Sequence, residues 1–351
     1  MIYFAWFFMA TVFVVIGSRL YYGKSISPKE VLAHFGAGVV AALLGTMFTV
    51  MSMWSGTLET NLLHGKITGK EKQYTSCEHQ YKCGESCSSD SKGNRTCTPI
   101  YCDEHTNDWD WVVRSSVGNF TIDRIDRRGS HEPPRWSKVV VGEPATLTTT
   151  TNNFLKAMED TVLLPPKSEI ISNVKEPSTF DYYRVSLVDN NSKVSVQGFN
   201  EYLREWLKEN GAKKQVAPWV IVTDYPTEAY ADSVLYQVKG GDKNALIMIY
   251  GVGAEGKVNW FRAHTFAMGM NNAVLITQLR QAALGDVLNL DMLKNQMALV
   301  EKHFVRVSNK EFKDLFDSSV KANPWVIFVL VVLQIVGMAF IGRKFHQEEM
   351  F

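Results

Sequence analysis

The residues best suited to chemistry lie in one short window of cysteines and histidines. It holds all five cysteines and two histidines: Cys77, His79, Cys83, Cys87, Cys97, Cys102 and His105. The Ser- and Gly-rich surroundings cannot form a hydrophobic core, so this segment needs cross-links. In an oxidising compartment the default is two disulfides with one cysteine left over. The alternatives are a structural zinc ion held by four of the seven side chains, or unpaired thiols.

Three residues in the C-terminal half are candidates for catalysis. Asp224 ends an expected strand, where open α/β sheets bind ligands, Asp242 precedes the next strand, and His264 ends a third. Asp224 also suits the start of a helix before Pro226, and His264 suits a sheet edge. We therefore expect a structural role for each ahead of a catalytic one. The chain contains no nucleophile elbow, phosphate loop or metal-binding helix motif.

A glycine pattern in the same half matches the dinucleotide-binding fingerprint by letters alone. The pattern is Gly251-x-Gly253-x-x-Gly256. That fingerprint requires a helix directly after it, whose N-terminus faces a pyrophosphate, but the following residues read as a strand. The pattern therefore predicts a hairpin turn.

Three hydrophobic blocks bracket the polar part of the chain, at residues 1–17, 33–54 and 325–342. None contains Asp, Glu, Lys or Arg. Roughly 17–25 apolar residues suffice to cross a membrane as a helix, so each block predicts a transmembrane span. The first block lacks a basic leader and a small-residue cleavage site, which argues against a signal peptide.

Basic residues next to the blocks predict the orientation. They occur in the loop 18–32 and the tail 343–351: Arg19, Lys24, Lys29, Arg343 and Lys344. Because such residues favour the cytoplasmic side, we expect the N-terminus outside and the C-terminus inside. The main domain is then extracytoplasmic, or periplasmic if the host is Gram-negative.

Small residues in the second block recur at helical spacing, as Gly38-x3-Ala42 and Ala41-x3-Gly45. Small side chains let helices approach closely in lipid. This Gly38–Gly45 face predicts packing against the other spans first, and homo-oligomer formation second.

The segment between the anchors is expected to fold. A hydrophobic content of 46% is too high for disorder, and a net charge of +1 offers no reason to expect nucleic acid as a partner. We divide it into a Cys-rich, β-containing region (55–140), a connector with a hairpin (141–198) and an α/β domain (199–322).

Several elements are expected before the α/β domain. Alternation over Phe120–Arg127 predicts a strand with a solvated, ion-paired face and three partly buried residues: Phe120, Ile122 and Ile125. A short helix is expected at Asn153–Val162. Asp181–Val188 and Lys193–Phe199 predict a hairpin around a turn at Asp189–Ser192.

The α/β domain has the most regular pattern. We expect a helix from Phe199 that Gly211 closes, and a last helix with a stripe from Leu290 to Phe304. Between them we expect strands at 218–224, 244–251 and 258–265 and helices at 226–239 and 272–284. The order predicts an α/β sandwich with a mixed sheet.

The segment 199–305 resembles the TPM domain family. The resemblance rests on PWVIVTD, a short helix, GGDKNALIMIYG, a turn, VNWFRAHT and a following helix. Asp242–Ala245 stands where the family has Asp-Asn-Gly, and His264–Met270 stands in place of its Gly-x-Gly-x-Glu-Gly motif. The resemblance implies an extracytoplasmic, membrane-tethered domain with a phosphatase or an assembly role.

A second resemblance covers roughly residues 75–150. The Cys-rich window, the acidic Trp motif Asp108–Trp111 and the Glu132–Trp136 motif (EPPRW) are similar to uncharacterised membrane proteins of tailed bacteriophages. This resemblance implies an origin but names no activity.

Three functions follow as hypotheses. The first is a non-enzymatic, membrane-anchored interaction or assembly protein with an envelope or membrane protein as its partner. The second is a metal-assisted phosphatase-like hydrolase that uses Asp224 and Asp242. The third, a channel, is weakest because the spans carry only His34 and Gln334 as polar candidates. Apart from the zinc alternative, no cofactor is expected.

Overall fold

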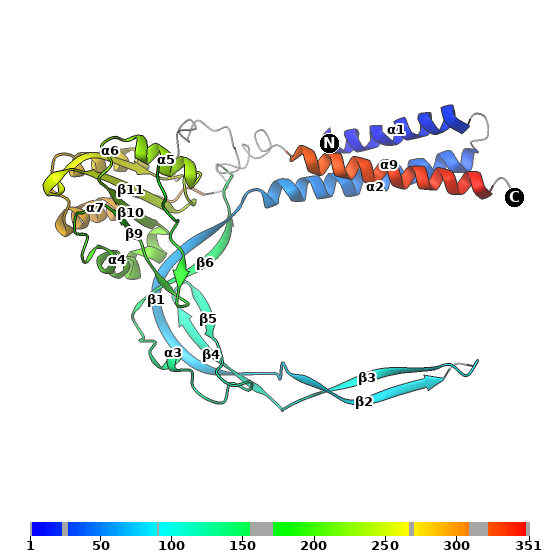
Figure 1. Ribbon diagram of the computed structural model, residues 1–351, viewed down its shortest axis with the longest axis horizontal. Coiled ribbons are helices and arrows are strands. Elements are labelled where there is room, and N and C mark those ends of the chain that lie inside the picture. Colours follow the sequence, from blue (N-terminus) through cyan, green and yellow to red (C-terminus); the bar gives the residue numbers. More distant parts are fainter. Residues whose placement is uncertain are drawn as a thin grey trace. The chain divides into compact units, whose positions relative to one another are not determined.

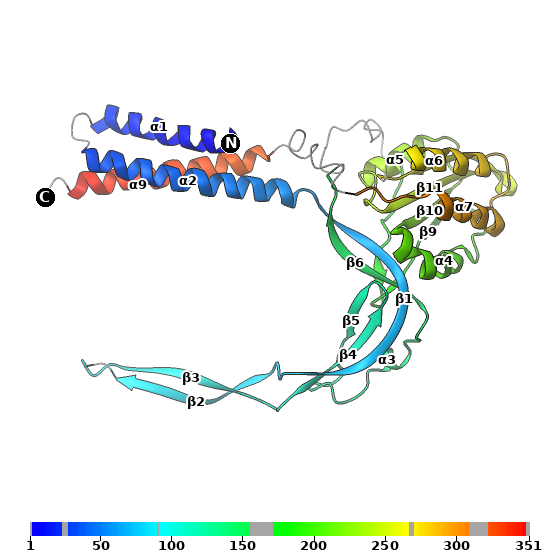
Figure 2. The same cartoon turned by 180° about the vertical axis from the view of Figure 1, so that it is seen from behind.

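The chain forms two compact units (Figures 1 and 2). The computed structural model describes residues 2–22, 27–89, 91–154, 171–266, 270–308 and 322–348. One unit contains three long helices with residues 151–154, and the other contains the strands and the remaining helices. The expected helix at Asn153–Val162 lies almost entirely outside the described residues.

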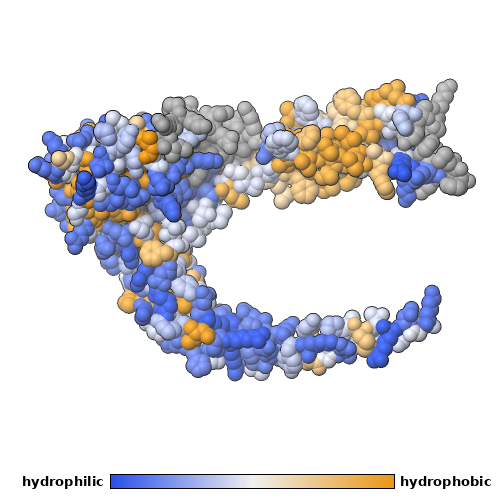
Figure 3. Space-filling view, in the orientation of Figure 1, coloured by the Kyte–Doolittle hydropathy of each residue, from blue (hydrophilic) through white to orange (hydrophobic). Residues whose placement is uncertain are grey.

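The three helices are α1 (Ile2–Tyr22), α2 (Pro28–Ser55) and α9 (Pro324–Glu348), each long and apolar enough to span a membrane. Their surface is largely apolar (Figure 3). Each helix extends past its hydrophobic block. Ser27 caps α2 by accepting a hydrogen bond of 3.2 Å from the backbone N–H of Glu30. Much of the expected loop 18–32 is therefore helical.

The small-residue face of α2 packs against α1. A Cβ atom added at Gly38 would lie 2.4 Å from the Thr11 side chain, and one at Gly45 would lie 2.9 Å from the Phe7 ring. Gln334 of α9 donates hydrogen bonds to the Phe7 carbonyl (2.8 Å) and the Thr11 hydroxyl (2.9 Å). The small residues of α2 therefore allow close packing between spans of the same chain. Formation of a homo-oligomer through this face stays a prediction.

A four-stranded sheet of order β5-β4-β1-β6 occupies one part of the second unit. The strands are β1 (Leu58–Thr75), β4 (Asp108–Ser115), β5 (Gly118–Ile122) and β6 (Pro144–Asn152). A small core lies against it: Ile67, Val113, Ile122, Val139, Ala145 and Tyr183. The short helix α3 (Pro134–Ser137) carries Trp136, whose indole N–H donates to the Val112 carbonyl of β4 (3.2 Å).

The strand predicted over Phe120–Arg127 ends at Ile122, so the second half of that prediction is wrong. Ile122 is buried, but Ile125 is 59% exposed. The segment after Ile122 forms a loop whose charged side chains bond to β4 and to the backbone of the loop itself. Arg124, for example, bonds Asp110 at 2.6 Å.

The Cys-rich window forms an antiparallel hairpin of β2 (Gln80–Ser89) and β3 (Arg95–Asp103). These strands pair only with each other among the described elements. Two disulfides, Cys83–Cys102 and Cys87–Cys97, link them, and Cys77 is the one free cysteine. This confirms the disulfide alternative for four of the five cysteines.

The α/β domain has the predicted mixed sheet, and its strand order is β12-β11-β10-β9. Its strands β9, β10 and β11 are parallel and β12 is antiparallel: Val188–Asn191, Ala217–Thr223, Ala245–Val252 and Val258–His264. One face packs on α4 (Phe199–Lys214), α6 (Met270–Ala283) and α7 (Leu290–His303), the other on α5 (Ala229–Gln237).

The predicted hairpin around Asp189–Ser192 is wrong. Residues 188–191 form β9, which pairs in parallel with β10, and α4 connects these two strands. Parallel neighbours require such a crossover connection, and β9, which contains Asp189, is the edge strand of the sheet. A small hairpin occurs instead between β7 (Thr179–Phe180) and β8 (Arg184–Val185).

Helix α4 does not end at Gly211 as predicted but continues to Lys214. Gly211 is buried where α4 crosses β1, and a Cβ there would lie 2.5 Å from the His64 carbonyl oxygen. The glycine thus serves close packing. Nearby, the Asn244 side chain donates to the Leu62 carbonyl at 2.6 Å.

The glycine pattern at residues 251–256 joins β11 to β12 through a short 3-10 turn, η2 (Ala254–Gly256). The two strands are antiparallel, which confirms the predicted hairpin. A Cβ at Gly251 would overlap the Trp260 ring, at 1.9 Å, so this glycine is needed for packing.

Candidate functional site

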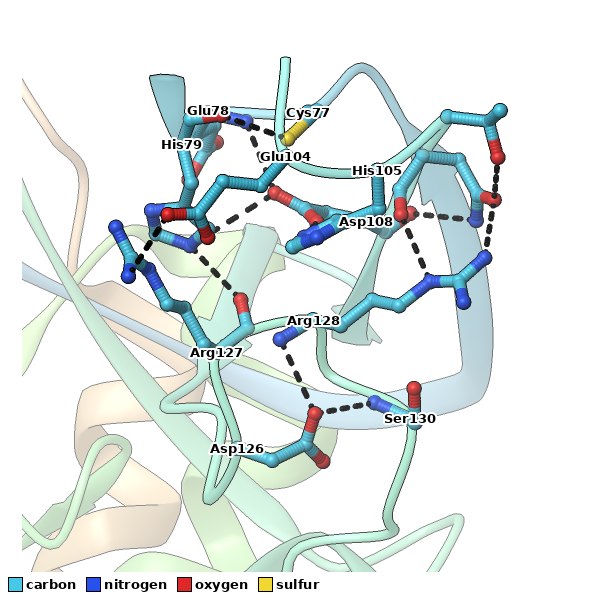
Figure 4. A network of polar contacts seen from close by, with 12 residues as sticks. Cys77, Glu78, His79, Glu104, His105, Asp108, Asp126, Arg127, Arg128 and Ser130 are labelled. Atoms are coloured by element: carbon cyan, nitrogen blue, oxygen red, sulfur yellow. Dashed lines mark hydrogen bonds and ion pairs between the residues drawn. The ribbon is translucent and has the colours of Figure 1, made fainter. Parts of the chain in front are cut away.

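The candidate site lies where the β2–β3 hairpin leaves the four-stranded sheet. Two connections pass through this junction, one from β1 to β2 and one from β3 to β4. Thr75 pairs with Asp108 on one side of the junction, and Gln80 pairs with Asp103 on the other. Side chains from the two connections therefore meet here (Figure 4).

Four side chains, which we name the neck cluster, converge at this junction: Cys77, His79, His105 and Asp108. The Cys77 sulfur, a His105 ring nitrogen and an Asp108 carboxylate oxygen lie within 4.8 Å of one another. His105 Nε2 is 2.6 Å from Asp108 Oδ1. The His79 and His105 rings are adjacent, with centroids 5.9 Å apart.

Asp108 is the buried anion of the cluster, with 0% of its side chain exposed. Burial raises its pKa, but the Glu78 backbone N–H, His105 and Arg124 together outweigh that effect and lower the pKa. Oδ2 accepts from the Glu78 N–H at 2.9 Å and lies 3.3 Å from Arg124 Nη1. The carboxylate is therefore ionised and oriented.

Neighbouring acidic groups balance the charge of Arg124. Its guanidinium contacts Asp110 at 2.6 Å and Glu78 at 3.3 Å as well as Asp108. Arg124 is largely buried, so it belongs to the wall of the site. The expected solvated strand face is wrong for this residue.

The loop beside the cluster is ordered by Asp126 (Figure 4). Its carboxylate accepts from three backbone N–H groups: those of Arg128 (3.1 Å), Ser130 (2.9 Å) and His131 (2.7 Å). These bonds, led by that of His131, hold the pKa of Asp126 well below its usual range. The Arg127 carbonyl of this loop lies 2.8 Å from His79 Nε2, so the loop positions one histidine of the cluster.

The zinc alternative retains only part of its predicted ligand set. Cys83, Cys87, Cys97 and Cys102 are taken up by the disulfides, so they cannot supply thiolates. Of the seven predicted side chains, Cys77, His79 and His105 come together. Asp108 was not predicted as a ligand, although its position three residues after His105 was an available signal.

The three catalytic candidates are not brought into one site. Asp224 follows the C-terminal end of β10, whereas Asp242 precedes the N-terminal end of the parallel strand β11. At roughly 3.3 Å per residue, the strand length separates these ends by about 20 Å. His264 pairs with Ile247, near the Asp242 end. Asp224 and Asp242 therefore cannot share a metal ion.

His264 is suited to a structural role. Burial, assisted by the charge of Arg262, lowers its pKa to about 4, so it is neutral at physiological pH. Its ring packs edge-on against Phe266, with centroids 5.5 Å apart. The neck cluster is thus the better-assembled group of chemistry-bearing side chains among the described residues.

Comparison with protein-family models, curated proteins and solved structures finds no match to this chain.

Proposed function

We propose that the chain is a membrane-anchored interaction protein whose β2–β3 hairpin contacts a protein partner outside the cytoplasm. The observation that carries this proposal is a hairpin exposed on both faces yet cross-linked twice.

The hairpin gains little from burial. Nearly every residue of β2 and β3 is exposed, and a two-stranded hairpin alone is marginally stable in water. A disulfide typically adds roughly 2–4 kcal/mol by restricting the unfolded chain. Because cross-links and not a core stabilise this element, its side chains are available for contacts with a partner.

That surface offers apolar and aromatic contacts. Tyr81, Ile100 and Tyr101 are 51%, 46% and 59% exposed. Tyrosine gives a large contact area at a low cost in side-chain entropy, and for this reason it is enriched at binding surfaces. Among the described strands, neither β2 nor β3 pairs along its outer edge, to which a partner strand can add.

The cross-links and the basic residues support the same orientation. Disulfides persist in oxidising compartments, which supports a position of the hairpin outside the cytoplasm. Arg19 and Lys29 lie at the ends of α1 and α2 that face the short loop, and Arg343 lies towards the end of α9. The positive-inside rule assigns these ends to the cytoplasm, with the N-terminus outside.

The TPM-like and phage-like resemblances complete the proposal. In this proposal the α/β domain is a TPM-like assembly module, and the chain acts at a bacterial envelope. The hydrolase alternative loses its geometric basis, because Asp224 and Asp242 lie at opposite ends of their strands.

Site-specific photo-crosslinking in intact cells tests the proposal. A photoreactive phenylalanine analogue placed at Tyr81 or Tyr101 should give one discrete adduct with a protein, and Ile100→Asp should abolish it. The same analogue at Phe180, an exposed aromatic on β7, is the matched control and should give none. Adducts that are absent at both hairpin positions, or identical at Phe180, would contradict the proposal.

A further inference from the structure

The neck cluster contains two polar atoms without hydrogen-bond partners. Asp108 Oδ1 and His105 Nε2 are both buried, and neither makes a hydrogen bond within the described part of the chain. They approach to 2.6 Å, but not along a direction that suits an N–H···O bond. Leaving buried polar groups unsatisfied is unfavourable, so a cation that contacts both atoms from beside the pair would satisfy them.

Asp108 Oδ1 contacts His105 Nε2, which is itself a candidate ligand, and is otherwise available for such a cation. The other carboxylate oxygen, Oδ2, is held by the Glu78 N–H and Arg124. Outer contacts of this kind commonly orient a metal-binding carboxylate. The Cys77 sulfur lies on the same side of the cluster, within 4.8 Å of both other donor atoms.

We propose that Cys77, His105 and Asp108 bind one divalent transition-metal ion of the zinc class, with solvent in the fourth position. A thiolate, an imidazole and a carboxylate form a donor set that zinc favours, whereas calcium and magnesium prefer oxygen donors alone. Three converging protein donors plus a water complete a tetrahedron.

The local charges suit a divalent cation. As ligands, a Cys77 thiolate and the Asp108 carboxylate would supply two negative charges, which neutralise the ion. Arg124, whose guanidinium lies 3.3 Å from Asp108 Oδ2, is already paired with Asp110 and Glu78. The positive charge of the arginine is therefore compensated before the metal binds.

His79 is adjacent to the ion but is not a ligand. Its Nε2 lies 2.8 Å from the Arg127 carbonyl and 3.9 Å from Asp108 Oδ2. It therefore connects the cluster to the loop ordered by Asp126. The bound ion would join the segment after β1 to the start of β4, which are the two points from which the hairpin leaves the sheet.

The proposal also accounts for the unpaired cysteine. A free, partly exposed thiol among disulfides is prone to oxidation or to pairing between chains. Metal ligation would protect the Cys77 thiol and leave Cys83–Cys102 and Cys87–Cys97 undisturbed.

Cobalt binding to the full-length protein tests this inference. The chain, with any affinity tag removed, is purified in detergent without reductant, stripped with a chelator and titrated with Co²⁺. We expect one ion per chain, the visible absorption bands of tetrahedral cobalt and an ultraviolet thiolate-to-cobalt band. Zn²⁺ should displace the cobalt and slow the reaction of Cys77 with a thiol reagent.

Four variants identify the ligands. Cys77→Ser should abolish the thiolate band, and both Cys77→Ser and His105→Gln should weaken binding at least roughly tenfold. His79→Gln should leave the spectrum nearly unchanged. His131→Gln is the matched control, because His131 is 79% exposed and outside the cluster.

Three results would overturn the proposal. They are no retained cobalt in the wild type, equal affinity in the wild type, Cys77→Ser and His105→Gln, or a disulfide between two copies through Cys77 on a non-reducing gel. Cys77→Ser replaces sulfur by oxygen at a partly exposed position and His105→Gln changes another segment, so two independent variants guard against a folding defect.

Discussion

Gly211→Ala tests the contact that holds β1 against the α/β domain. The added methyl group would lie 2.5 Å from the His64 carbonyl oxygen and 2.6 Å from the His64 Cβ. The His64 backbone cannot yield easily. Its strand is bonded within the sheet, and Asn244 holds the Leu62 carbonyl at 2.6 Å.

Opposing effects determine how much Gly211→Ala changes the free energy of unfolding. Replacing glycine by alanine within a helix usually stabilises the helix by about 1 kcal/mol. Overpacking costs roughly 1–3 kcal/mol, and weakening the buried bond from Asn244 to Leu62 costs about 1 kcal/mol more. The expected net loss in the free energy of unfolding is therefore about 1–3 kcal/mol.

Thermal unfolding in detergent, followed by tryptophan fluorescence, measures this loss. A domain of this size should show a Tm lower by about 2–12 °C. Gly69→Ala is the control, because Gly69 lies in the same strand and nothing occupies the space within 4 Å of its added Cβ. If Gly211→Ala matches or exceeds the wild type in stability, the proposed close packing of α4 on β1 is refuted.

Three further changes have defined outcomes. Gln334→Leu removes the hydrogen bond of 2.8 Å to the Phe7 carbonyl and should destabilise the helical unit by about 1 kcal/mol in detergent unfolding assays. Replacing Cys87 and Cys97 together by serine opens a cross-link of ten-residue separation, costs roughly 2–3 kcal/mol, and should make the hairpin a site of limited proteolysis. Burial lowers the pKa of His64 to about 3, so unfolding at acid pH takes up a proton there. Between about pH 6.5 and 4.5 the wild type should lose about 2 kcal/mol that His64→Gln retains.

A different result would contradict each of these three predictions. An unchanged unfolding transition in Gln334→Leu would show that the buried amide does not join the helices. Resistance to proteolysis in the double serine variant would show that the cross-strand ladder alone orders the hairpin. Parallel pH profiles for the wild type and His64→Gln would show that this imidazole stays accessible to protons in the folded state.

Local signals in the sequence predicted much of the secondary structure. Uncharged apolar blocks, helical periodicity from Leu290 onward and the wholly apolar strand at residues 244–251 each depend on nearby residues alone. The expected elements there match α1, α2, α9, α7 and β11 in type, with shifts at their ends. Helix ends moved because capping and interhelical packing, not apolar content, set them.

Pairing between distant strands could not be predicted in the same way. Asp189–Ser192 has the composition of a hairpin turn, yet residues 188–191 form β9, which α4 connects to its parallel neighbour β10. A glycine such as Gly211 is typical of a helix end, yet it lies inside α4, where β1 packs against it. Both errors arose because the deciding neighbour is far away in the sequence.

By itself, the sequence determined that the chain has three apolar helices long enough to span a membrane, that a mixed α/β domain is present and that the cysteine window needs cross-links. Only the tertiary structure decided which cysteines pair, that Asp224 and Asp242 lie at opposite ends of the sheet, and that Asp108 meets Cys77 and His105. The physical reason is the distance along the sequence over which each property acts. Hydropathy and periodicity are local properties, whereas a site depends on strand register between segments that the sequence keeps apart.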